Sequence, residues 1–243
     1  MRQKLDYWSA LTAASESRRS LASKGISLRV TVNDAEVHET VEKIGKSYLT
    51  PWLDPVKNDF TPDNYFWLIA SREEAPVIVG GGRLDVVGND AAGHLHRAFS
   101  RGYGPDAVAA VNPEVSARLR GRLCYLGDLF SRSGAGLSQT HRRSFLVVAN
   151  YIASQHFKAD CTYSFMRMHD VKRGSADING LDKRVYHPLH WGVIPQARDE
   201  SEIIVYREAR DDQSYFDIFT QELEPRVPRS RACHDGPSQE VLA

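Results

Sequence analysis

The stretch Tyr125–Ser138 reads YLGDLFSRSGAGLS and holds the features that decide the fold, the end of a strand and a glycine-rich turn. The hydrophobic pattern predicts a strand over 123–130 and, with apolar residues at helical spacing, a helix over 139–157. Two glycines and an alanine between them allow a tight turn. Free amides and the positive end of the helix dipole make such a turn an anion site. A turn that only closes the strand-to-helix connection is the alternative.

The turn lacks the two common phosphate-binding motifs. Gly134 and Gly136 are followed by Gln139, so the dinucleotide fingerprint GxGxxG is absent, and the P-loop ending GK[ST] is absent as well. We therefore expect any phosphate held here to be bound by backbone amides, without a dedicated cationic side chain.

The sequence before the turn predicts strands and helices of ordinary length. In chain order we expect a helix over 1–22, a strand over 26–32, a helix from Asn33 to about Pro51, and a hairpin of strands 65–71 and 77–87. Within the second hairpin strand, the run Gly80–Gly82 predicts a bulge or a close backbone approach. Residues 88–120 form a long connection, with a short helix expected over 113–120.

The sequence after the turn continues the alternation. We expect a strand over 161–168, a helix or irregular helical segment over 170–181, and strands over 184–191 and 202–207. Beyond Arg210 the chain becomes polar, although Phe216, Ile218 and Phe219 could dock on the body of the protein. The composition predicts disorder from about residue 224 to the end.

This order predicts one α/β domain with a central mixed, mostly antiparallel sheet flanked by helices, an N-terminal helix and a polar C-terminal tail. We expect an N-terminal helical extension over 1–25, the α/β domain over 26–210 and a C-terminal extension over 211–243.

The composition excludes several classes of partner. The 243 residues include 31 basic and 31 acidic residues, so the net charge does not indicate a nucleic-acid or anionic-membrane surface. No apolar run has the length of a membrane span or signal peptide, and the three cysteines are far apart in the sequence. We expect a cytoplasmic protein with reduced thiols. The histidine pairs His94/His96 and His187/His190 have no nearby ligand pattern, so no metal site is expected.

The element order over 26–207 and the glycine turn resemble the GNAT superfamily of acyl-CoA N-acyltransferases. In that family a strand ends in a Q/R-x-x-G-x-G/A turn whose amides bind the pyrophosphate of coenzyme A. Gly136 matches the family's glycine and Ser138 takes the final small-residue position, whereas Ser133 stands where glutamine or arginine is usual. The resemblance implies that coenzyme A contacts Leu129, Arg132, Ser133, Gly134, Ala135, Gly136, Leu137, Ser138 and Arg142.

The resemblance also implies a reaction in which an amine loses a proton and attacks a thioester, whose sulfur is then protonated. Asp128, at the end of the strand, is the candidate base or contact to the acceptor amine, and a capping or exposed residue is the alternative. Family members often carry a tyrosine in the segment that corresponds to 169–181, and none is present here. His169 is the candidate in its place, with capping of the helix as the alternative.

The predicted function is transfer of an acyl group from acetyl-CoA or another acyl-CoA to a primary amine of a small molecule or protein, by direct attack in a ternary complex. Two alternatives stay open. One is a non-catalytic acyl-CoA-binding or regulatory domain, which the departure at Ser133 favours. The other is an acyltransferase that takes a long-chain acyl group from acyl carrier protein. A homodimer also stays open as the assembly.

Overall fold

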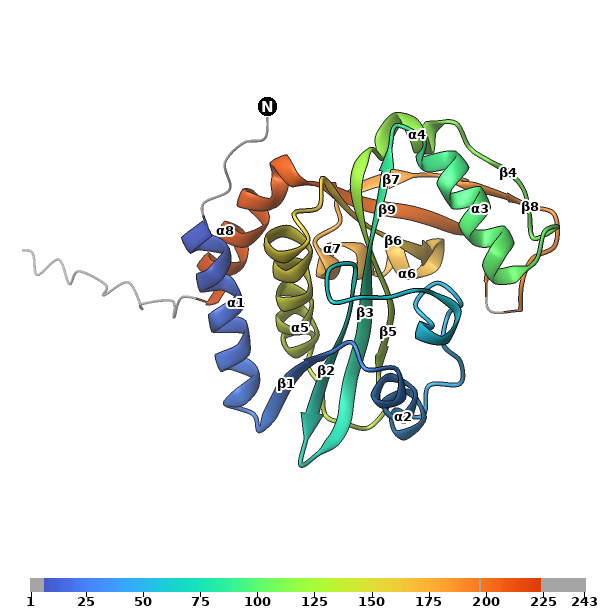
Figure 1. The fold of residues 1–243 in the computed structure, drawn as a ribbon. Coiled ribbons are helices and arrows are strands. Elements are labelled where there is room, and N and C mark those ends of the chain that lie inside the picture. The colour runs from blue at the N-terminus through green and yellow to red at the C-terminus, as the bar shows by residue number, and fades with distance from the viewer. Residues whose placement is uncertain (1–6, 197, 224–243) are drawn as a thin grey trace, which may run out of the picture.

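The computed structural model describes residues 7–196 and 198–223, which form a layered α/β fold (Figure 1). A seven-stranded sheet has the order β1-β2-β3-β5-β6-β9-β7, and β4 pairs with β8 in a second, two-stranded sheet. The strands are β1 (Ile26–Thr31), β2 (Tyr65–Arg72), β3 (Ala75–Gly88), β4 (Val108–Val111), β5 (Gly121–Ser131), β6 (Cys161–Arg167), β7 (Lys183–Val185), β8 (Leu189–Trp191) and β9 (Glu202–Glu208).

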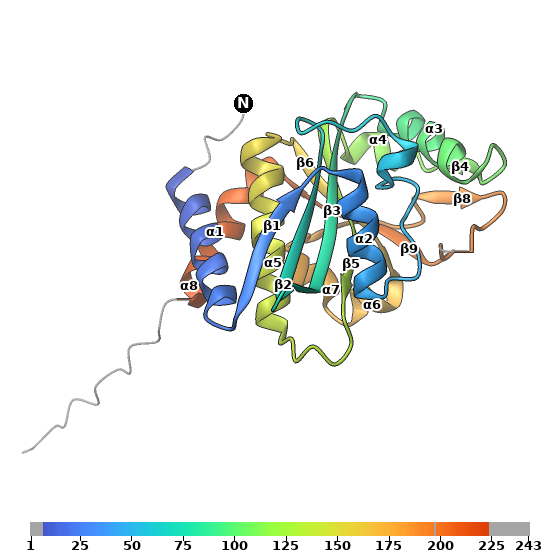
Figure 2. The same cartoon turned by 60° about the horizontal axis from the view of Figure 1, so that its bottom comes forward.

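The helices cover both faces of the large sheet (Figures 1 and 2). They are α1 (Tyr7–Ala22), α2 (Asp34–Ile44), α3 (Ala91–Tyr103), α4 (Glu114–Arg118), α5 (Gln139–Tyr151), α6 (Met168–Lys172), α7 (Ser175–Asn179) and α8 (Asp212–Leu223), with 3-10 turns at Pro55–Lys57 and Ala209–Asp211 and a π-helical turn at Ile152–His156. Apolar side chains of α2 and α3 pack with one face of the sheet, and those of α5 pack with the other. Helices α1 and α8 lie outside α5.

The seven-stranded sheet has six pairs of neighbouring strands. Only one of these pairs, β5 with β6, is parallel. The predicted fold class, a mixed and mostly antiparallel sheet flanked by helices, is therefore confirmed. The single parallel pair requires a crossover, and α5 supplies it on the face opposite α2. The glycine turn begins this crossover.

The glycine run in β3 marks a close approach, as the sequence predicts. A Cβ on Gly81 would lie 2.9 Å from the indole nitrogen of Trp67, and one on Gly82 would overlap the ring of Phe66. Both aromatic residues come from β2, whose pairing with β3 continues through the run. The bulge lies instead in β5, where the register with β3 shifts between Val79 and Gly81.

The connection over 88–120 holds more structure than its sequence indicates. Helix α3 was not predicted, because Gly93 and Gly102 weaken its helical propensity, yet Leu95 and Phe99 on its inner face are buried in the core. The predicted strand over 184–191 is in fact two strands, β7 and β8, in different sheets. His187 has φ of 46° and Pro188 has no amide hydrogen, so a continuous strand cannot pass through them.

Both ends of the described chain pack together. Helix α8 covers the segment after Arg210, and Phe216 and Phe219 are buried against α1 and α5 as expected, whereas Ile218 is exposed. Helix α2 ends at Ile44, before the expected end at Pro51, because Gly45 takes a left-handed C-cap. Residues 224–243, for which disorder is predicted, lie outside the described residues. Among the described helices, none combines the length and apolar character that a membrane crossing requires.

Candidate functional site

A cavity of 530 Å³ opens where β5 and β6 diverge. The two strands pair only from Leu123–Cys161 to Tyr125–Tyr163, after which β5 keeps β3 and β6 keeps β9 as a neighbour. The segments 126–130 and 164–167 line opposite walls of the cavity, and α5 contributes a third wall. The edge of β5 that faces β6 beyond Tyr125 is therefore free of ladder bonds to β6, so its backbone can bind a ligand.

The bulge in β5 shapes one wall of this cavity. Asp128 has φ of 54°, a left-handed conformation, and the three residues after Gly127 span the distance that β3 covers in two. Such an insertion bends the strand and interrupts its pairing. Leu129, which the resemblance assigns to coenzyme A, follows the bulge, is partly exposed and lines the cavity.

The Asp128 carboxylate is occupied by protein donors. It lies 2.6 Å from the Lys46 ammonium and accepts hydrogen bonds from the hydroxyl and the amide of Thr50, at 2.6 and 3.1 Å. Only 2% of the Asp128 side chain and 8% of the Lys46 side chain are exposed. These contacts give Asp128 a positioning role, because they fix the segment after α2 to the bulge. Asp128 also lines the cavity, and its role as base or contact to the acceptor amine stays a prediction.

His169 stands apart from the cavity. It belongs to the short helix α6, its side chain is half-exposed, and its Nε2 lies 3.2 Å from the carboxylate of Asp170. Asp170 and Ser175 line the cavity, whereas His169 does not contribute to its walls. The expected role in protonating a thiolate thus has no support from the position of His169.

The glycine turn is open on its outer side. Gly134 and Gly136 have positive φ, and a Cβ on either would meet no atom within 4 Å. The guanidinium of Arg72, from β2, donates to the carbonyl of Ala135 at 2.8 Å and holds the turn against the sheet. Arg132 donates to the carbonyl of Lys43, at the end of α2, so its side chain is committed to protein.

Some of the backbone amides at the start of α5 already have hydrogen-bond partners within the helix. Ser138 caps the helix by accepting from the His141 amide, and the His141 ring accepts from the Ser138 amide, forming a capping box. Burial, Arg72 and Lys24 lower the pKa of His141. Arg72 and Lys24 therefore lie close enough to His141 to act on it electrostatically. Of the other predicted contacts, Leu137 is partly buried, and Ser133 and Arg142 are exposed.

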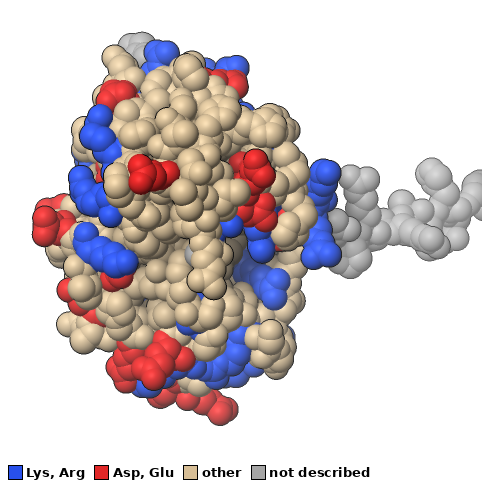
Figure 3. All heavy atoms as spheres, turned by 90° about the vertical axis from the view of Figure 1, so that its right-hand side faces the viewer, with Lys and Arg blue, Asp and Glu red and all other residues tan. Residues whose placement is uncertain are grey.

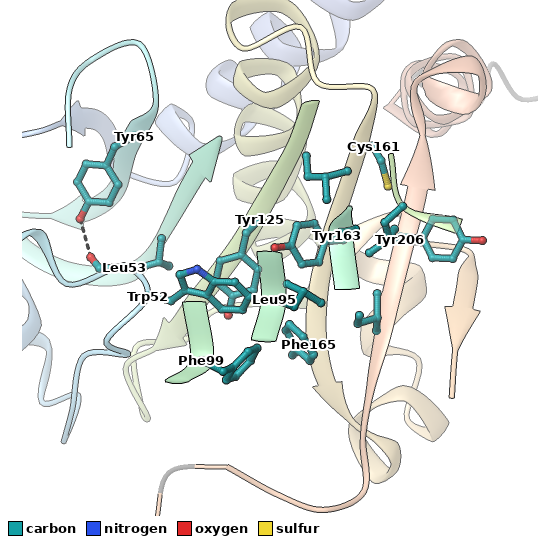
Figure 4. Packing of buried hydrophobic residues seen from close by; sticks show 14 of the residues in the cluster. Trp52, Leu53, Tyr65, Leu95, Phe99, Tyr125, Cys161, Tyr163, Phe165 and Tyr206 are labelled. Carbon is teal, nitrogen blue, oxygen red and sulfur yellow. Dashed lines mark hydrogen bonds between the residues drawn. The ribbon is translucent and has the colours of Figure 1, made fainter. Parts of the chain in front are cut away.

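Sequence reasoning missed an arginine and a glutamate on the far side of the cavity. Arg198, in the connection between β8 and β9, and Glu202, at the start of β9, line the cavity with 5% and 9% of their side chains exposed. The Arg198 guanidinium lies over the rings of Phe99 and Phe165, 5.0 Å from each centroid. These rings belong to the aromatic cluster around Trp52 and Tyr125 (Figure 4). In the sequence, Arg198 and Glu202 are marked only by their spacing of four residues, and oppositely charged residues at this spacing are common at protein surfaces.

Burial changes the acid–base properties of this region. It raises the pKa of Tyr48, Tyr103 and Tyr125 above the ordinary value of a phenol, which is already protonated at neutral pH. It also raises the pKa of the Glu202 carboxyl, against the opposing effect of Arg198. A carboxylate with a raised pKa is a better proton acceptor near neutral pH than an exposed one. Glu202 is therefore the stronger candidate base at this cavity.

Comparisons with known proteins give a likeness of overall arrangement. No protein-family model matches the chain, and no curated protein matches it significantly. It is similar to NAA60 from Arabidopsis thaliana in complex with acetyl-CoA, at 10% identity, with 75% of this chain and 98% of that chain covered and a TM-score of 0.45. It is also similar to FeeM, an N-acyl amino acid synthase from uncultured soil microbes, at 12% identity, with 81% and 97% covered and a TM-score of 0.44.

An acetyltransferase from Streptococcus agalactiae is similar to the same extent, at 11% identity, with 76% of this chain and 99% of that chain covered and a TM-score of 0.44. A likeness at this level does not identify the activity of the chain. The chain's own topology has the mixed, mostly antiparallel sheet and the strand, glycine turn and helix that its sequence predicted, and in this arrangement it resembles the GNAT fold.

Proposed function

We propose that the chain is an N-acyltransferase that moves an acyl group from an acyl-CoA to a primary amine by direct attack in a ternary complex. The observation that carries this proposal is the divergence of β5 and β6, which opens the 530 Å³ cavity. This cavity is lined by the end of β5, the strand that leads into the glycine turn, and by α5, the helix that follows the turn. A long, narrow thioester donor needs such a gap for its arm and an anion site at one end for its phosphates.

The residues around the turn fit the phosphate end of the donor. The cations Arg72 and Lys24 lie close to the turn, and the outer side of Gly134 and Gly136 is open to a ligand. The arm of the donor would then follow the edge of β5 between Leu126 and Leu129, whose amides are not used by β6. The same amides can stabilise the negative charge that develops on the thioester oxygen during attack.

The reaction itself needs little from the protein. The amine nitrogen forms a bond to the thioester carbon, the carbon–sulfur bond breaks, and the electron pair leaves with the sulfur. A carboxylate accepts the proton that the amine loses, and solvent can protonate the thiolate. Holding donor and acceptor together in one cavity supplies a large part of the rate enhancement.

Filling the gap between β5 and β6 tests the proposal. Ser164 lies on β6, is buried and lines the cavity, so Ser164→Phe places a ring in the path of the donor. We expect coenzyme A affinity, measured by titration calorimetry, to fall at least about tenfold, while the matched control Ser164→Ala binds as the wild type does. Ala149→Phe, from the α5 wall, gives the same test from the opposite side should Ser164→Phe fail to fold.

Four outcomes decide between the proposal and its alternatives. Release of free thiol from acetyl-CoA or octanoyl-CoA in the presence of an amine panel supports the acyltransferase. Binding of these donors without thiol release for any amine indicates an acyl-CoA-binding domain and contradicts catalysis. Turnover with octanoyl-acyl carrier protein, but not with octanoyl-CoA, shows that the carrier protein is the donor. Failure of every donor to bind contradicts the proposed site itself.

A further inference from the structure

Three ion pairs line the cavity, and they differ in how they are bonded. In two of them the charges also share a hydrogen bond, at 2.6 and 2.9 Å. In the third, the charged atoms lie 3.2 Å apart but do not have hydrogen-bond geometry. The two hydrogen-bonded pairs are Lys46–Asp128 and Arg167–Asp170, and the third pair is Arg198–Glu202.

The third pair keeps unused bonding capacity on both charges. Nε and Nη2 of Arg198 and Oε2 of Glu202 are buried without a hydrogen-bond partner among the described residues. Native proteins satisfy nearly all such atoms, because a buried polar group without a partner costs stability. An exception on both members of one charged pair, in the wall of the largest cavity described, indicates a site that a ligand completes.

The surroundings of Arg198 select the shape of that ligand. Aromatic rings approach the guanidinium, with Phe99 and Phe165 at 5.0 Å and Tyr103 at 5.8 Å from its central carbon. A guanidinium that stacks on rings through its faces still presents its N–H groups along its edge. Two parallel N–H groups on one edge match the two oxygens of a carboxylate.

The charges of the cavity select the charge of that ligand. The three cations are balanced by the three anions, so a ligand with a large net charge of either sign would be left unpaired. A molecule that carries one carboxylate and one ammonium fits the open pair, because each group meets the opposite charge. Compounds with these two groups on the same carbon atom are the α-amino acids.

We propose that the acyl acceptor is an α-amino acid, whose carboxylate is bound by Arg198 and whose ammonium group is bound by Glu202. This inference rests on the proposed N-acyltransferase function and names its acceptor class. The ammonium group gives one proton to the Glu202 carboxylate, and the free amine then forms the amide bond as the carbon–sulfur bond breaks. The thiolate leaves with the electron pair of that bond and takes up the second proton that the nitrogen loses, so it is released as the thiol. The raised pKa of Glu202 suits this proton transfer.

The main experiment compares amino acids with the amines that remain after decarboxylation. Acetyl-CoA and octanoyl-CoA are offered with L-leucine against 3-methylbutylamine and L-phenylalanine against phenethylamine, and thiol release and product mass are measured. We expect the amino acid of a pair to have kcat/KM at least about 30-fold above its amine, because the amine leaves Arg198 unpaired. Equal or better turnover of the amines overturns the inference and leaves the acyltransferase function intact.

Variants of Arg198 show whether this residue reads the carboxylate. In Arg198→Met we expect kcat/KM for the amino acid to fall about 100-fold, mainly through KM, and by at least about tenfold more than that for the matched amine, which has no carboxylate to lose. Arg198→Lys should restore part of the preference, because a point charge replaces a planar fork. An equal loss for amino acid and amine in Arg198→Met, with unchanged coenzyme A affinity, overturns the role of Arg198.

A binding measurement keeps the inference testable without turnover. N-acetyl-L-leucine and N-acetyl-3-methylbutylamine differ only in the carboxylate, and calorimetric titration compares their binding to the wild type and to Arg198→Met. Tighter binding of the acid by the wild type alone supports the inference. Equal binding of both compounds, or no binding of either, overturns it. Loss of coenzyme A binding and of all thiol release would instead contradict the proposed function.

Discussion

Two buried ion pairs line the same cavity and are built in opposite ways. Lys46–Asp128 is closed, because the carboxylate accepts from the ammonium and from both donors of Thr50. Arg198–Glu202 is open, because its charges are close but leave three polar atoms without hydrogen bonds. Both pairs are nearly inaccessible to solvent, so burial does not explain the difference.

The difference separates a structural pair from a binding pair. A closed pair uses its hydrogen-bonding capacity within the protein, and here it holds the segment after α2 against the bulge of β5. An open pair keeps that capacity for a ligand, at a cost to the stability of the free protein.

The surface beside α3, β4 and β8 carries both positive and negative side chains around a hollow, and neither sign covers it alone (Figure 3).

Breaking the closed pair should give the largest effect. In Asp128→Asn the side chain keeps its shape and tolerates the positive φ, but Lys46 is left buried without a counter-charge. We expect the free energy of unfolding to fall by about 3–5 kcal/mol, measured by urea denaturation. The control Asp170→Asn removes one member of the more exposed pair with Arg167 and should cost under about 1 kcal/mol. Similar losses for both variants would contradict the structural role of Asp128.

Removing both members of the open pair should not lower the free energy of unfolding, in contrast to breaking the closed pair. The double variant Arg198→Met with Glu202→Met replaces two incompletely bonded charges by apolar side chains of similar length, and the methionine at position 198 can pack against Phe99 and Phe165 in place of the guanidinium. We expect a neutral result or a gain of up to about 4 kcal/mol in the free energy of unfolding, together with loss of amino acid binding. A loss above about 2 kcal/mol would show that this pair also serves stability.

The smallest effect concerns pH. Because burial raises the pKa of Glu202 in the folded protein above 4.5, the native state binds more protons than the unfolded state between the two pKa values. This group therefore makes the protein less stable as pH rises through that window, and adds no slope below or above it. Urea denaturation from about pH 4 to about pH 8 should show this slope in the wild type and not in Glu202→Gln. Parallel curves for the two proteins would contradict the raised pKa.

The fold was largely predictable from local patterns. The alternation in Ile26–Thr31, the aromatic strand at Tyr65 and the glycine turn before Gln139 each predict the element that the structure contains. The glycine run in β3 indicated a close approach because only glycine fits beneath the rings of β2. Helix α3 was missed, because its apolar residues gain their stability from the core and not from helical propensity.

The candidate site was predictable only where it is local in sequence. The strand, the turn and the start of α5 are contiguous, so their residues alone indicate an anion site. The partners of Asp128 come from about 80 residues away, as Lys46 and Thr50, and no local pattern pairs them. His169 is the opposite case. Its residue type and its position in the chain both suit the predicted role, but its side chain does not line the cavity.

The sequence by itself thus determined the mixed sheet and the glycine turn, because periodicity and backbone freedom act over a few neighbouring residues. Only the tertiary structure decided which partners and which surroundings each charged side chain has. Asp128 became structural because the bulge brings it to Lys46, and Arg198 and Glu202 came to the cavity because the last connection folds back over α3 and β6. Burial then set the free energy of these charges, and burial is a property of the whole packed chain.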